Sequence, residues 1–367
     1  VLFRSCRFWW GCPLPFVRCR CNIHPAHKWQ RQYPGKQALS PERAYRPTDF
    51  KSEEKQEHEK GYCPFCSGNE KKSGDEILAY AKKPDREPNT PGWWVRVLEN
   101  KYPALQLGDN LKKKGIGIYD KMDGLGRHEI IIETEEHVKC ISDLSQVQVE
   151  KVILAYRDRY VEIASDKNIK HILIFKNYGE DAGASLEHAH SQLIATPVVP
   201  SRVETEILGA NDYYKFRDRC VYCDILDQEL IDRERIIDEN DEFLAFNFFA
   251  GKVPYETWIV PKHHNAYFST ISKGQIKDLA KIIRRVIKRI KLHLGDVNYN
   301  MVLHTAPVNT SNRIDDIFHW HLELMPKLTK IAGFEWGTGY YINPVFPEDA
   351  AKMLREIELD DEEDVLK

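Results

Sequence analysis

Two long stretches of the chain carry apolar residues at the spacing of one helix face. Polar and charged residues occupy the positions between them. This period of about 3.6 residues predicts two amphipathic helices, and each apolar stripe must lie on another layer of structure. The stripes are Val149, Val152, Ile153, Tyr156, Tyr160 and Ile163 in the first stretch, and Ile276, Leu279, Ile283, Val286 and Ile290 in the second.

Short segments rich in β-branched and aromatic residues flank each predicted helix. Such segments are typical of strands, and short turns between consecutive strands favour antiparallel pairing. Each half of the chain therefore reads as strand, strand, helix, strand, strand. This pattern predicts an α+β fold in which a mostly antiparallel sheet with a packed helix is used twice. The segments are HEIIIETEEH (128–137), KHILIFKNYG (170–179), YETWIVPKHH (255–264) and VNYNMVLHT (297–305).

The same motifs occur twice in the same order. Each copy opens with a Cys-x-x-Cys pair, continues through a glutamate followed eight residues later by a histidine, and closes with a His-x-His pair. The closing pair begins 51 residues after that histidine in one copy and 55 residues after it in the other. This agreement indicates a long internal repeat. The copies are Cys63, Cys66, Glu129, His137, His188 and His190, and Cys220, Cys223, Glu256, His264, His319 and His321.

The repeat divides the chain into two tandem domains. We expect residues 38–196 to form the N-terminal, catalytic domain and residues 197–357 the C-terminal domain, joined near residues 197–219. Residues 1–37 match neither copy. The first 22 residues begin with valine and hold four cysteines, which favours a mis-assigned start or a truncated reading frame. Residues 358–367 are expected to form a solvated acidic tail.

Composition excludes several classes of function. The 367 residues are 42% hydrophobic and 30% charged with a formal net charge of -3, so no positive field attracts nucleic acid or an anionic membrane. The chain lacks an apolar run of about 18 residues that would span a bilayer. Nine cysteines, partly arranged as two close pairs, favour a reducing cytoplasm with metal sites over a disulfide framework.

Two thiolates and two histidines are the ligand set of a tetrahedral structural zinc site. We assign two zinc ions, and the repeat supplies both ligand sets. A pair of reduced cysteines in a core turn and thioredoxin-like redox chemistry are alternatives for either pair alone, but neither accounts for the repeated histidines. His263 is interpreted as a surface residue. The sets are Cys63, Cys66, His137 and His188, and Cys220, Cys223, His264 and His319.

The segment NYGEDAGASLEHAHSQ (177–192) carries the candidate chemistry. On a strand, His188, His190 and Gln192 share one face, because side chains alternate. A neutral imidazole can attack phosphorus and carry the group as a labile phosphoramidate. Gln192 and Ser185 could donate to phosphoryl oxygens, and Gly183 allows close backbone approach. The residues alone leave a second interpretation open, in which the histidines fill a sheet face or both bind metal.

Several motifs together resemble the galactose-1-phosphate uridylyltransferase family, the two-repeat branch of the histidine triad superfamily. They are CPFCSGNE, GRHEIIIETEEH, NYGEDAGAS with EHAHSQ, FHWHLELMP and GFEWGTGYYINP, in the family's order over residues 38–357. The resemblance implies His190 as the nucleophile, Gln192 as its phosphoryl-supporting amide, and the first Cys/His set as a zinc site. It also implies substrate contacts at Arg43, Arg46, Asn100, Asn177, Gly183, Ala184, Ser185, Gly333, Phe334 and Glu335.

The chain also departs from the family pattern. Ala189 and Ser191 replace a proline and a glycine in the nucleophile motif. Some members lack the second Cys pair and hold their second metal with residues that correspond to Glu206, His304, His319 and His321, so another transition metal is an alternative there. The second copy carries Glu323 where the first has Gln192. Because a carboxylate opposes phosphate binding, we expect one active half and one structural half, with His321 not a nucleophile.

The resemblance predicts a cytoplasmic enzyme that exchanges UMP between UDP-glucose and galactose 1-phosphate through a uridylyl-histidine, in galactose metabolism. Its partners are a sugar nucleotide and a hexose 1-phosphate, and the family allows a homodimer. Relatives that act as ADP-glucose phosphorylases, which pass adenylate to phosphate, are the first alternative. A noncatalytic, zinc-scaffolded nucleotide-binding protein is the second.

Overall fold

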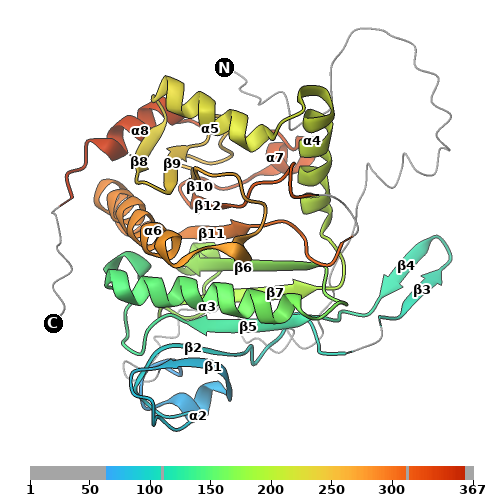
Figure 1. The fold of residues 1–367 in the computed structure, drawn as a ribbon, viewed down its shortest axis with the longest axis vertical. Helices are drawn as coiled ribbons and strands as arrows, with labels where there is room; N and C mark the ends of the chain where they lie inside the picture. The colour runs from blue at the N-terminus through green and yellow to red at the C-terminus, as the bar shows by residue number, and fades with distance from the viewer. Residues whose placement is uncertain (1–62, 109–110, 311–313, 360–367) are drawn as a thin grey trace.

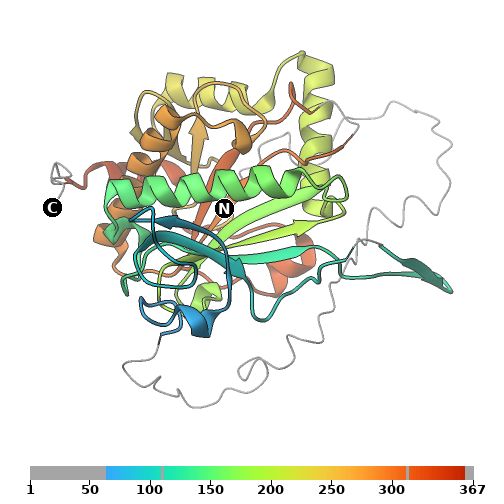
Figure 2. The ribbon, with the colours of Figure 1, turned by 60° about the horizontal axis from the view of Figure 1, so that its bottom comes forward.

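A ten-stranded antiparallel sheet forms the centre of the protein (Figure 1). The computed structural model describes residues 63–108, 111–310 and 314–359. Strand order is β1-β2-β5-β7-β6-β11-β12-β10-β9-β8, and a separate hairpin, β3-β4, projects from the body (Figure 2). The strands are β1 (Glu76–Ala81), β2 (Trp93–Glu99), β3 (Lys113–Ile116), β4 (Tyr119–Met122), β5 (Arg127–Ile132), β6 (His171–Tyr178), β7 (His190–Thr196), β8 (Ile236–Glu239), β9 (Phe243–Asn247), β10 (Thr257–Pro261), β11 (Tyr299–His304) and β12 (His321–Pro326).

The order of the strands reflects the sequence repeat. The five strands of the first half lie in the order β1-β2-β5-β7-β6, and those of the second half follow in mirrored order from β11 to β8. The halves meet where β6 pairs with β11, with Asn177 opposite Asn300. The predicted α+β class, with two repeats of antiparallel strands and a packed helix, is confirmed. Because both halves share one sheet, the predicted domain boundaries stay a prediction.

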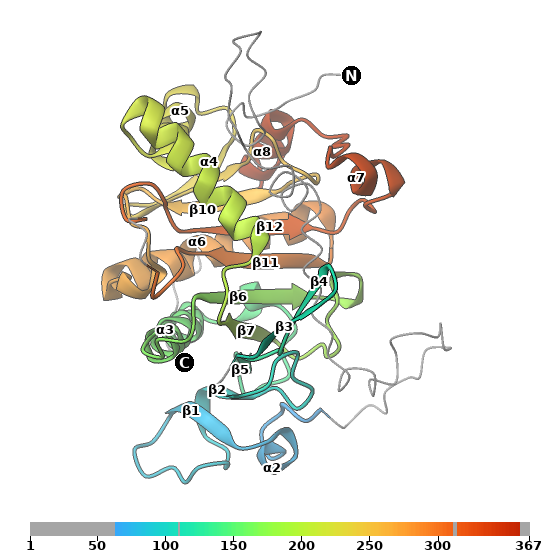
Figure 3. The ribbon, with the colours of Figure 1, turned by 90° about the vertical axis from the view of Figure 1, so that its right-hand side faces the viewer.

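Helices α3 and α6 are the two amphipathic helices that the apolar stripes predict. They lie side by side on one face of the sheet (Figure 3), and the stripe residues of both helices are buried in one core cluster. Ser145 caps α3 by accepting from the Gln148 N–H, and Ser272 forms a capping box with Gln275 at α6. The helices are α2 (Glu70–Ser73), α3 (Gln146–Ala164), α4 (Ser201–Arg217), α5 (Val221–Asp232), α6 (Lys273–Leu294), α7 (Gly333–Thr338) and α8 (Pro347–Arg355), with short 3-10 turns η2 (Ile141–Asp143), η3 (Glu180–Ala182) and η4 (Phe268–Thr270).

The opposite face of the sheet differs between the halves. In the second half, α4 and α5 cover it with a second apolar cluster that includes Tyr213, Tyr222 and Trp258. In the first half, the described residues on that face form a smaller cluster, in which Phe65 packs with Ile130 and Ile132. None of the helices within the described ranges has the length and apolar character needed to cross a membrane.

A sharp turn after β6 directs the chain into the loop before β7. Gly179 has φ 81° and ψ 162°, a conformation that is essentially restricted to glycine. A β-carbon at this position would lie 1.8 Å from Oδ1 of Asn298, whose amide donates to Asp181 at 3.0 Å. Both the backbone angle and the close approach therefore require glycine here.

Gly179→Ala should lower the free energy of unfolding by more than the roughly 1–3 kcal/mol expected from backbone strain alone. The matched control is Gly295→Ala, because Gly295 has a similar φ of 78° with nothing within 4 Å of the added β-carbon. Urea unfolding of both variants measures the difference. Equal destabilisation would show that the contact with Asn298 is unimportant.

Candidate active site and metal centres

Strand β7 places its first residues on two different faces of the sheet. His190 pairs with Ile132 and Gln192 pairs with Ile130 in the antiparallel ladder with β5. These residues face the side opposite α3, where the ring of Phe65 lies edge-on to His190 at a centroid distance of 5.4 Å. Ser191 points the other way and contacts Tyr156 of α3. The alternation predicted for His190 and Gln192 is therefore present.

The His190 ring is held in the tautomer that nucleophilic attack requires. Its Nδ1 lies 2.8 Å from the backbone carbonyl oxygen of His188. A carbonyl oxygen can only accept, so Nδ1 carries the proton and Nε2 keeps its lone pair. Burial lowers the pKa of His190, and the nearby Lys176 ammonium lowers it further. The imidazole is therefore neutral near pH 7 with an available Nε2.

A chain of hydrogen bonds orients the Gln192 amide. The Ala104 N–H donates to Nδ1 of His128 at 3.0 Å, which leaves the proton of that ring on Nε2. This Nε2–H donates to Oε1 of Gln192 at 2.9 Å. The Gln192 amide nitrogen is then the group left for a phosphoryl oxygen. Sequence reasoning missed His128, although the alternation of side chains along β5 places it on the same face of the sheet as Gln192.

The predicted ligand contact Asn100 joins the same group. Its Nδ2 lies 3.0 Å from Nε2 of His128, and its Oδ1 accepts from the Tyr102 N–H at 2.9 Å. The side chain is buried, with 9% of its surface exposed. Because the Asn100 amide nitrogen is itself a donor, it does not hydrogen-bond to the protonated Nε2. Asn100 lies beside the His128–Gln192 pair, and its contact with a substrate stays a prediction.

The loop between β6 and β7 holds the other predicted phosphate contacts. Gly183 adopts the left-handed conformation, with φ 87°, and the Ala184 N–H donates to the Gly179 carbonyl at 3.1 Å. Ser185 is exposed. Nδ2 of Asn300 on β11 donates to Oδ1 of Asn177 at 2.9 Å, so the second half of the chain orients a predicted contact at the end of β6, just before this loop.

The first predicted metal set comes together as one group. Cys63, Cys66, His137 and His188 place their ligand atoms within 4.8 Å of one another. Sγ of Cys66 lies 3.3 Å from Nδ1 of His137 and 3.6 Å from Nδ1 of His188. Tetrahedral zinc with ordinary zinc–sulfur and zinc–nitrogen bonds would separate S and N by about 3.5 Å. Nε2 of His188 donates to the Thr134 carbonyl at 2.8 Å, which leaves Nδ1 for a metal.

The second predicted set forms an equivalent group of Cys220, Cys223, His264 and His319. Sγ of Cys223 lies 3.2 Å from Nδ1 of His264 and 3.8 Å from Nδ1 of His319. Nε2 of His264 faces the Asp315 carbonyl at 2.6 Å, as His188 faces a carbonyl in the first group. Both groups therefore suit zinc, and within the described ranges no other Cys, His, Asp and Glu cluster meets the same distance criterion.

The alternative ligand set of the second half, Glu206, His304, His319 and His321, does not come together as one group in this structure. Nδ1 of His304 lies 3.5 Å from Oε2 of Glu206, and the ring of His304 stacks on His321 at 4.7 Å. His319 instead faces the cysteine pair. The geometry thus favours the Cys/His set for the second metal.

His321 is the counterpart of His190 in the second repeat, but its surroundings differ. Its Nδ1 faces the His319 carbonyl at 3.1 Å, as in the first repeat. Its ring stacks on Trp258 at a centroid distance of 4.4 Å as well as on His304, and 1% of its surface is exposed. The stacked aromatic rings occupy space that a phosphoryl group would need beside an attacking nitrogen.

The two halves also differ in the charge of the residue two positions after the second histidine. Glu323 accepts from Nε2 of His304 at 3.0 Å and from Nζ of Lys252 at 2.9 Å. It is therefore an anion with its own partners, where the first half has the neutral Gln192. This environment supports the prediction of a single active half.

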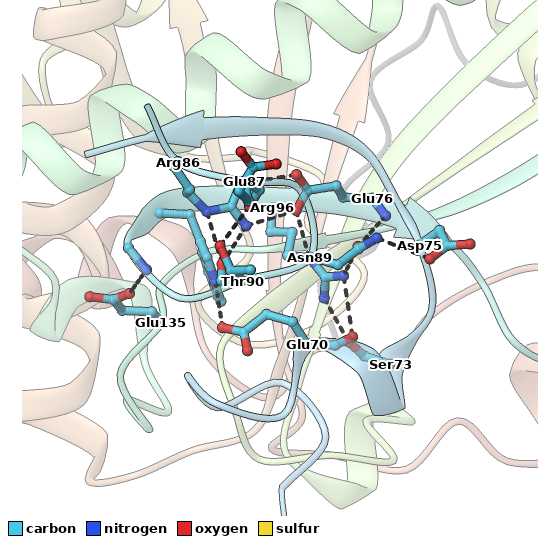
Figure 4. Close-up of polar contacts among 12 residues, drawn as sticks. Glu70, Ser73, Asp75, Glu76, Arg86, Glu87, Asn89, Thr90, Arg96 and Glu135 are labelled. Atoms are coloured by element: carbon cyan, nitrogen blue, oxygen red, sulfur yellow. Dashed lines mark hydrogen bonds and ion pairs between the residues drawn. The ribbon is translucent and has the colours of Figure 1, made fainter. Parts of the chain in front are cut away.

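A polar network holds the segment after the first cysteine pair against β1 and β2 (Figure 4). Arg96, with 1% of its surface exposed, donates to Oγ of Ser73 at 2.7 Å and to the Gly74 carbonyl at 2.6 Å. Glu76 accepts two hydrogen bonds from Arg86, at 2.9 and 2.8 Å, and one from Arg96 at 3.1 Å. The network fixes α2 and its preceding loop, and with them the position of Cys66.

Other predicted contacts lie elsewhere. Gly333, Phe334 and Glu335 are on α7, which follows β12 in the chain and has no buried residue. Oε2 of Glu335 accepts from the Ala332 N–H at 3.0 Å. Arg43 and Arg46 lie outside the described residues. A role in substrate binding stays a prediction for all five.

Comparison with known proteins places the sequence among sugar-nucleotide enzymes. Residues 22–200 match the N-terminal domain and residues 172–362 the C-terminal domain of galactose-1-phosphate uridyl transferase. ADP-glucose phosphorylase of Arabidopsis thaliana is 38% identical over 88% of this chain and 90% of its own. Galactose-1-phosphate uridylyltransferase of Thermotoga maritima is 34% identical over 72% of this chain and 85% of its own.

Solved structures agree with the sequence matches. The crystal structure of an ADP-glucose phosphorylase from Arabidopsis thaliana with bound ADP-glucose superposes with a TM-score of 0.71, at 35% identity. The match covers 87% of this chain and 95% of that one. The architecture described above is therefore shared over nearly the full length of that enzyme.

Metal analysis should find close to two zinc ions per chain in protein purified without added metal. Cys66→Ser and Cys223→Ser should each reduce the content by about one ion and lower stability, because a structural zinc site contributes on the order of 10 kcal/mol or more. Cys140→Ser is the control, since Cys140 is buried outside both groups. Well under one ion in the unmodified protein would refute both assignments.

Glu76→Gln should lower the free energy of unfolding by about 1–2 kcal/mol at pH 7. Burial raises the pKa of Glu76, but hydrogen bonds from Arg86, the Asn89 backbone and Arg96, together with the Arg86 charge, outweigh burial and the net pKa is lowered. The contribution is thus present above the unfolded pKa of about 4.3 and is lost as pH falls through the lower folded pKa.

Urea unfolding of both proteins between pH 7 and pH 3 measures this dependence. Asp212→Asn is the control, because Asp212 forms an exposed ion pair with Lys215 at 3.7 Å. It should leave stability unchanged at every pH. A pH-independent effect of Glu76→Gln would exclude the charge as its cause.

Proposed function

Because the chain belongs to the galactose-1-phosphate uridylyltransferase family of nucleotidyltransferases, we propose that His190 accepts a nucleotidyl group from a hexose nucleotide and passes it to a phosphate-bearing acceptor. The observation that carries this proposal is the hydrogen bond from Nδ1 of His190 to the His188 carbonyl. It leaves Nε2 unprotonated and ready to attack.

The reaction takes two displacements. Nε2 of His190 attacks the α-phosphorus, the bond from that phosphorus to the bridging oxygen breaks, and hexose 1-phosphate leaves with the electron pair. A phosphate oxygen of the acceptor then attacks the same phosphorus, and the nitrogen–phosphorus bond breaks. The acceptor gains the nucleotidyl group and His190 returns to its neutral form, so no net proton change is required at the ring.

The residues around His190 suit a phosphoryl group that gains negative charge. The amide nitrogen of Gln192 is available because His128 binds the amide oxygen. The exposed Ser185 and the open backbone at Gly183 lie on the loop that leads to His190. Neutral donors of this kind stabilise developing charge without adding a competing anion.

We propose ADP-glucose as the donor and inorganic phosphate as the acceptor. The Arabidopsis phosphorylase supports this choice, because its similarity extends over more of this chain than that of the Thermotoga relative and its structure contains ADP-glucose. The Thermotoga uridylyltransferase supports the second candidate, UMP exchange between UDP-glucose and galactose 1-phosphate. A noncatalytic binding protein would not need the oriented nucleophile.

The two Cys/His groups would hold structural zinc, and the ion of the first group would fix His188 beside His190. Their free thiols support a reducing compartment such as the cytoplasm. A homodimer, which the family resemblance implies, stays a prediction.

Intact mass measured after mixing with one sugar nucleotide, without acceptor, tests the proposal. ADP-glucose should add one adenylyl group that survives a mildly alkaline quench, and His190→Ala should abolish the adduct. His321→Ala is the matched control from the second repeat and should keep it. An adduct with UDP-glucose alone would establish the second candidate, and no adduct with either would refute covalent transfer.

A further inference from the structure

A buried ion pair lies directly behind the nucleophile, on the face of the sheet that α3 covers. Nζ of Lys176 on β6 is 2.8 Å from Oε2 of Glu133, which follows β5, and their side chains are 1% and 0% exposed. Removing two charges from water costs several kcal/mol per ion. Two apolar side chains could fill the same space without this cost. The contacts that Lys176 and Glu133 make therefore indicate why a charged pair lies here.

Lys176 also bonds to the nucleophile's own backbone. Its Nζ lies 3.1 Å from the carbonyl oxygen of His190. The neighbouring Ala189 carbonyl accepts from the Glu133 N–H at 3.1 Å. Because carbonyl directions alternate along a strand, the His190 carbonyl points the other way, toward β6.

On that side the strands separate. The register of β6 with β7 ends at Phe175 opposite Gln192, whereas the register of β5 with β7 continues to Ile132 opposite His190. Beyond Phe175, β6 continues to Tyr178 paired with β11 alone, and the loop 179–185 follows it. Lys176 therefore spans the gap where a ladder hydrogen bond to the His190 carbonyl would otherwise lie.

Glu133 is fixed from several directions. Its carboxylate accepts from Oγ of Ser191 and from the Tyr156 hydroxyl at 3.3 Å, and its carbonyl accepts from Nε2 of Gln148 at 2.5 Å. The carboxylate thus links β7 with α3 and holds the Lys176 ammonium in one place. The arrangement leaves the ammonium little freedom to follow a displaced His190.

We propose that Lys176, anchored by Glu133, is a positioning residue that fixes the His190 peptide where β6 and β7 diverge and so aims Nε2 at the α-phosphorus. The inference rests on the proposed function for its kinetic consequence. A misplacement of about 1 Å in a reacting group can cost on the order of 100-fold in rate. The pair therefore acts on the rate of transfer to His190 rather than on sugar-nucleotide binding.

The chain contains a matched control pair. Arg159 of α3 donates to both carboxylate oxygens of Glu129, at 2.7 and 2.6 Å. Both side chains are buried, at 0% and 2% exposed. This pair lies on the same face of β5 and joins the same helix, and its hydrogen bonds do not include the backbone of His190.

The first test compares two neutral pairs, Lys176→Met/Glu133→Gln and Arg159→Met/Glu129→Gln. The first should slow single-turnover nucleotidylation of His190 by about 10- to 100-fold, while the half-saturating sugar-nucleotide concentration changes less than threefold. The second should leave the rate per folded molecule within twofold. An unchanged rate in the first, or an equal loss in the second, would overturn the inference.

Lys176→Arg supplies a second variant that keeps the charge pair, in case the neutral pair does not fold. A guanidinium holds its donors in a fixed planar fork rather than around one nitrogen, so it does not reproduce the ammonium's paired contacts with Glu133 and the His190 carbonyl, and we expect a slower rate per folded molecule. If Lys176→Arg transfers the nucleotide at the original rate, the inference fails.

A turnover-independent measurement separates this inference from the proposed function. In NMR spectra of protein with ¹⁵N-labelled histidine, the ring signals of His190 are those that disappear in the His190→Ala variant. In the unmodified protein these signals should report the Nδ1-protonated tautomer alone. The Lys176→Met/Glu133→Gln pair should shift them toward a mixture of tautomers. If unmodified protein forms no adduct, the proposed function fails, while unchanged tautomer signals in the variant would refute the positioning role.

Discussion

The hydrogen bond from the His190 ring to the His188 carbonyl is the interaction on which the site depends. It determines which ring nitrogen is free, and its acceptor belongs to a residue whose side chain points at the first cysteine pair. A metal held there would immobilise His188, and with it the carbonyl that selects the His190 tautomer. The polar network around Arg96 and Glu76 stabilises the same cysteine segment from outside. The first Cys/His group and His190 are thus one structural unit.

The two halves share the same strand arrangement and the same His-x-His geometry, but the surroundings of the second histidine differ. In both, the second histidine faces the carbonyl of the first. The halves differ in what covers that face. Helices α4 and α5 and the ring of Trp258 fill it in the second half, and Glu323 provides a negative charge. In the first half it is lined by His128, Gln192 and a glycine-bearing loop. The covering elements and one side-chain charge therefore distinguish the two halves, while the shared sheet holds the second histidine of each pair in an equivalent position.

Much of this organisation could be predicted from the sequence. The period of the apolar residues predicted α3 and α6. The repeated spacings predicted both Cys/His groups, because the spacing of ligands in the sequence follows from the lengths of strands and turns. Contacts across strands could not be read in this way. His128 reaches Gln192, Asn300 reaches Asn177, and Lys176 reaches Glu133 only once the register between strands is known. The covering helices α4 and α5 were not expected, because the stretch 201–232 has a weak apolar stripe.

The pairing of β6 with β11 has a consequence for how the chain can be divided. Each strand is the inner boundary of its repeat, and each repeat taken alone would expose a full row of unpaired backbone N–H and C=O groups along it. Such an exposed row is a template for association with other chains. In the intact chain, each repeat covers the other's open border. The second repeat thus protects the open border of the first even though its own His321 is enclosed, which gives a reason for retaining both copies.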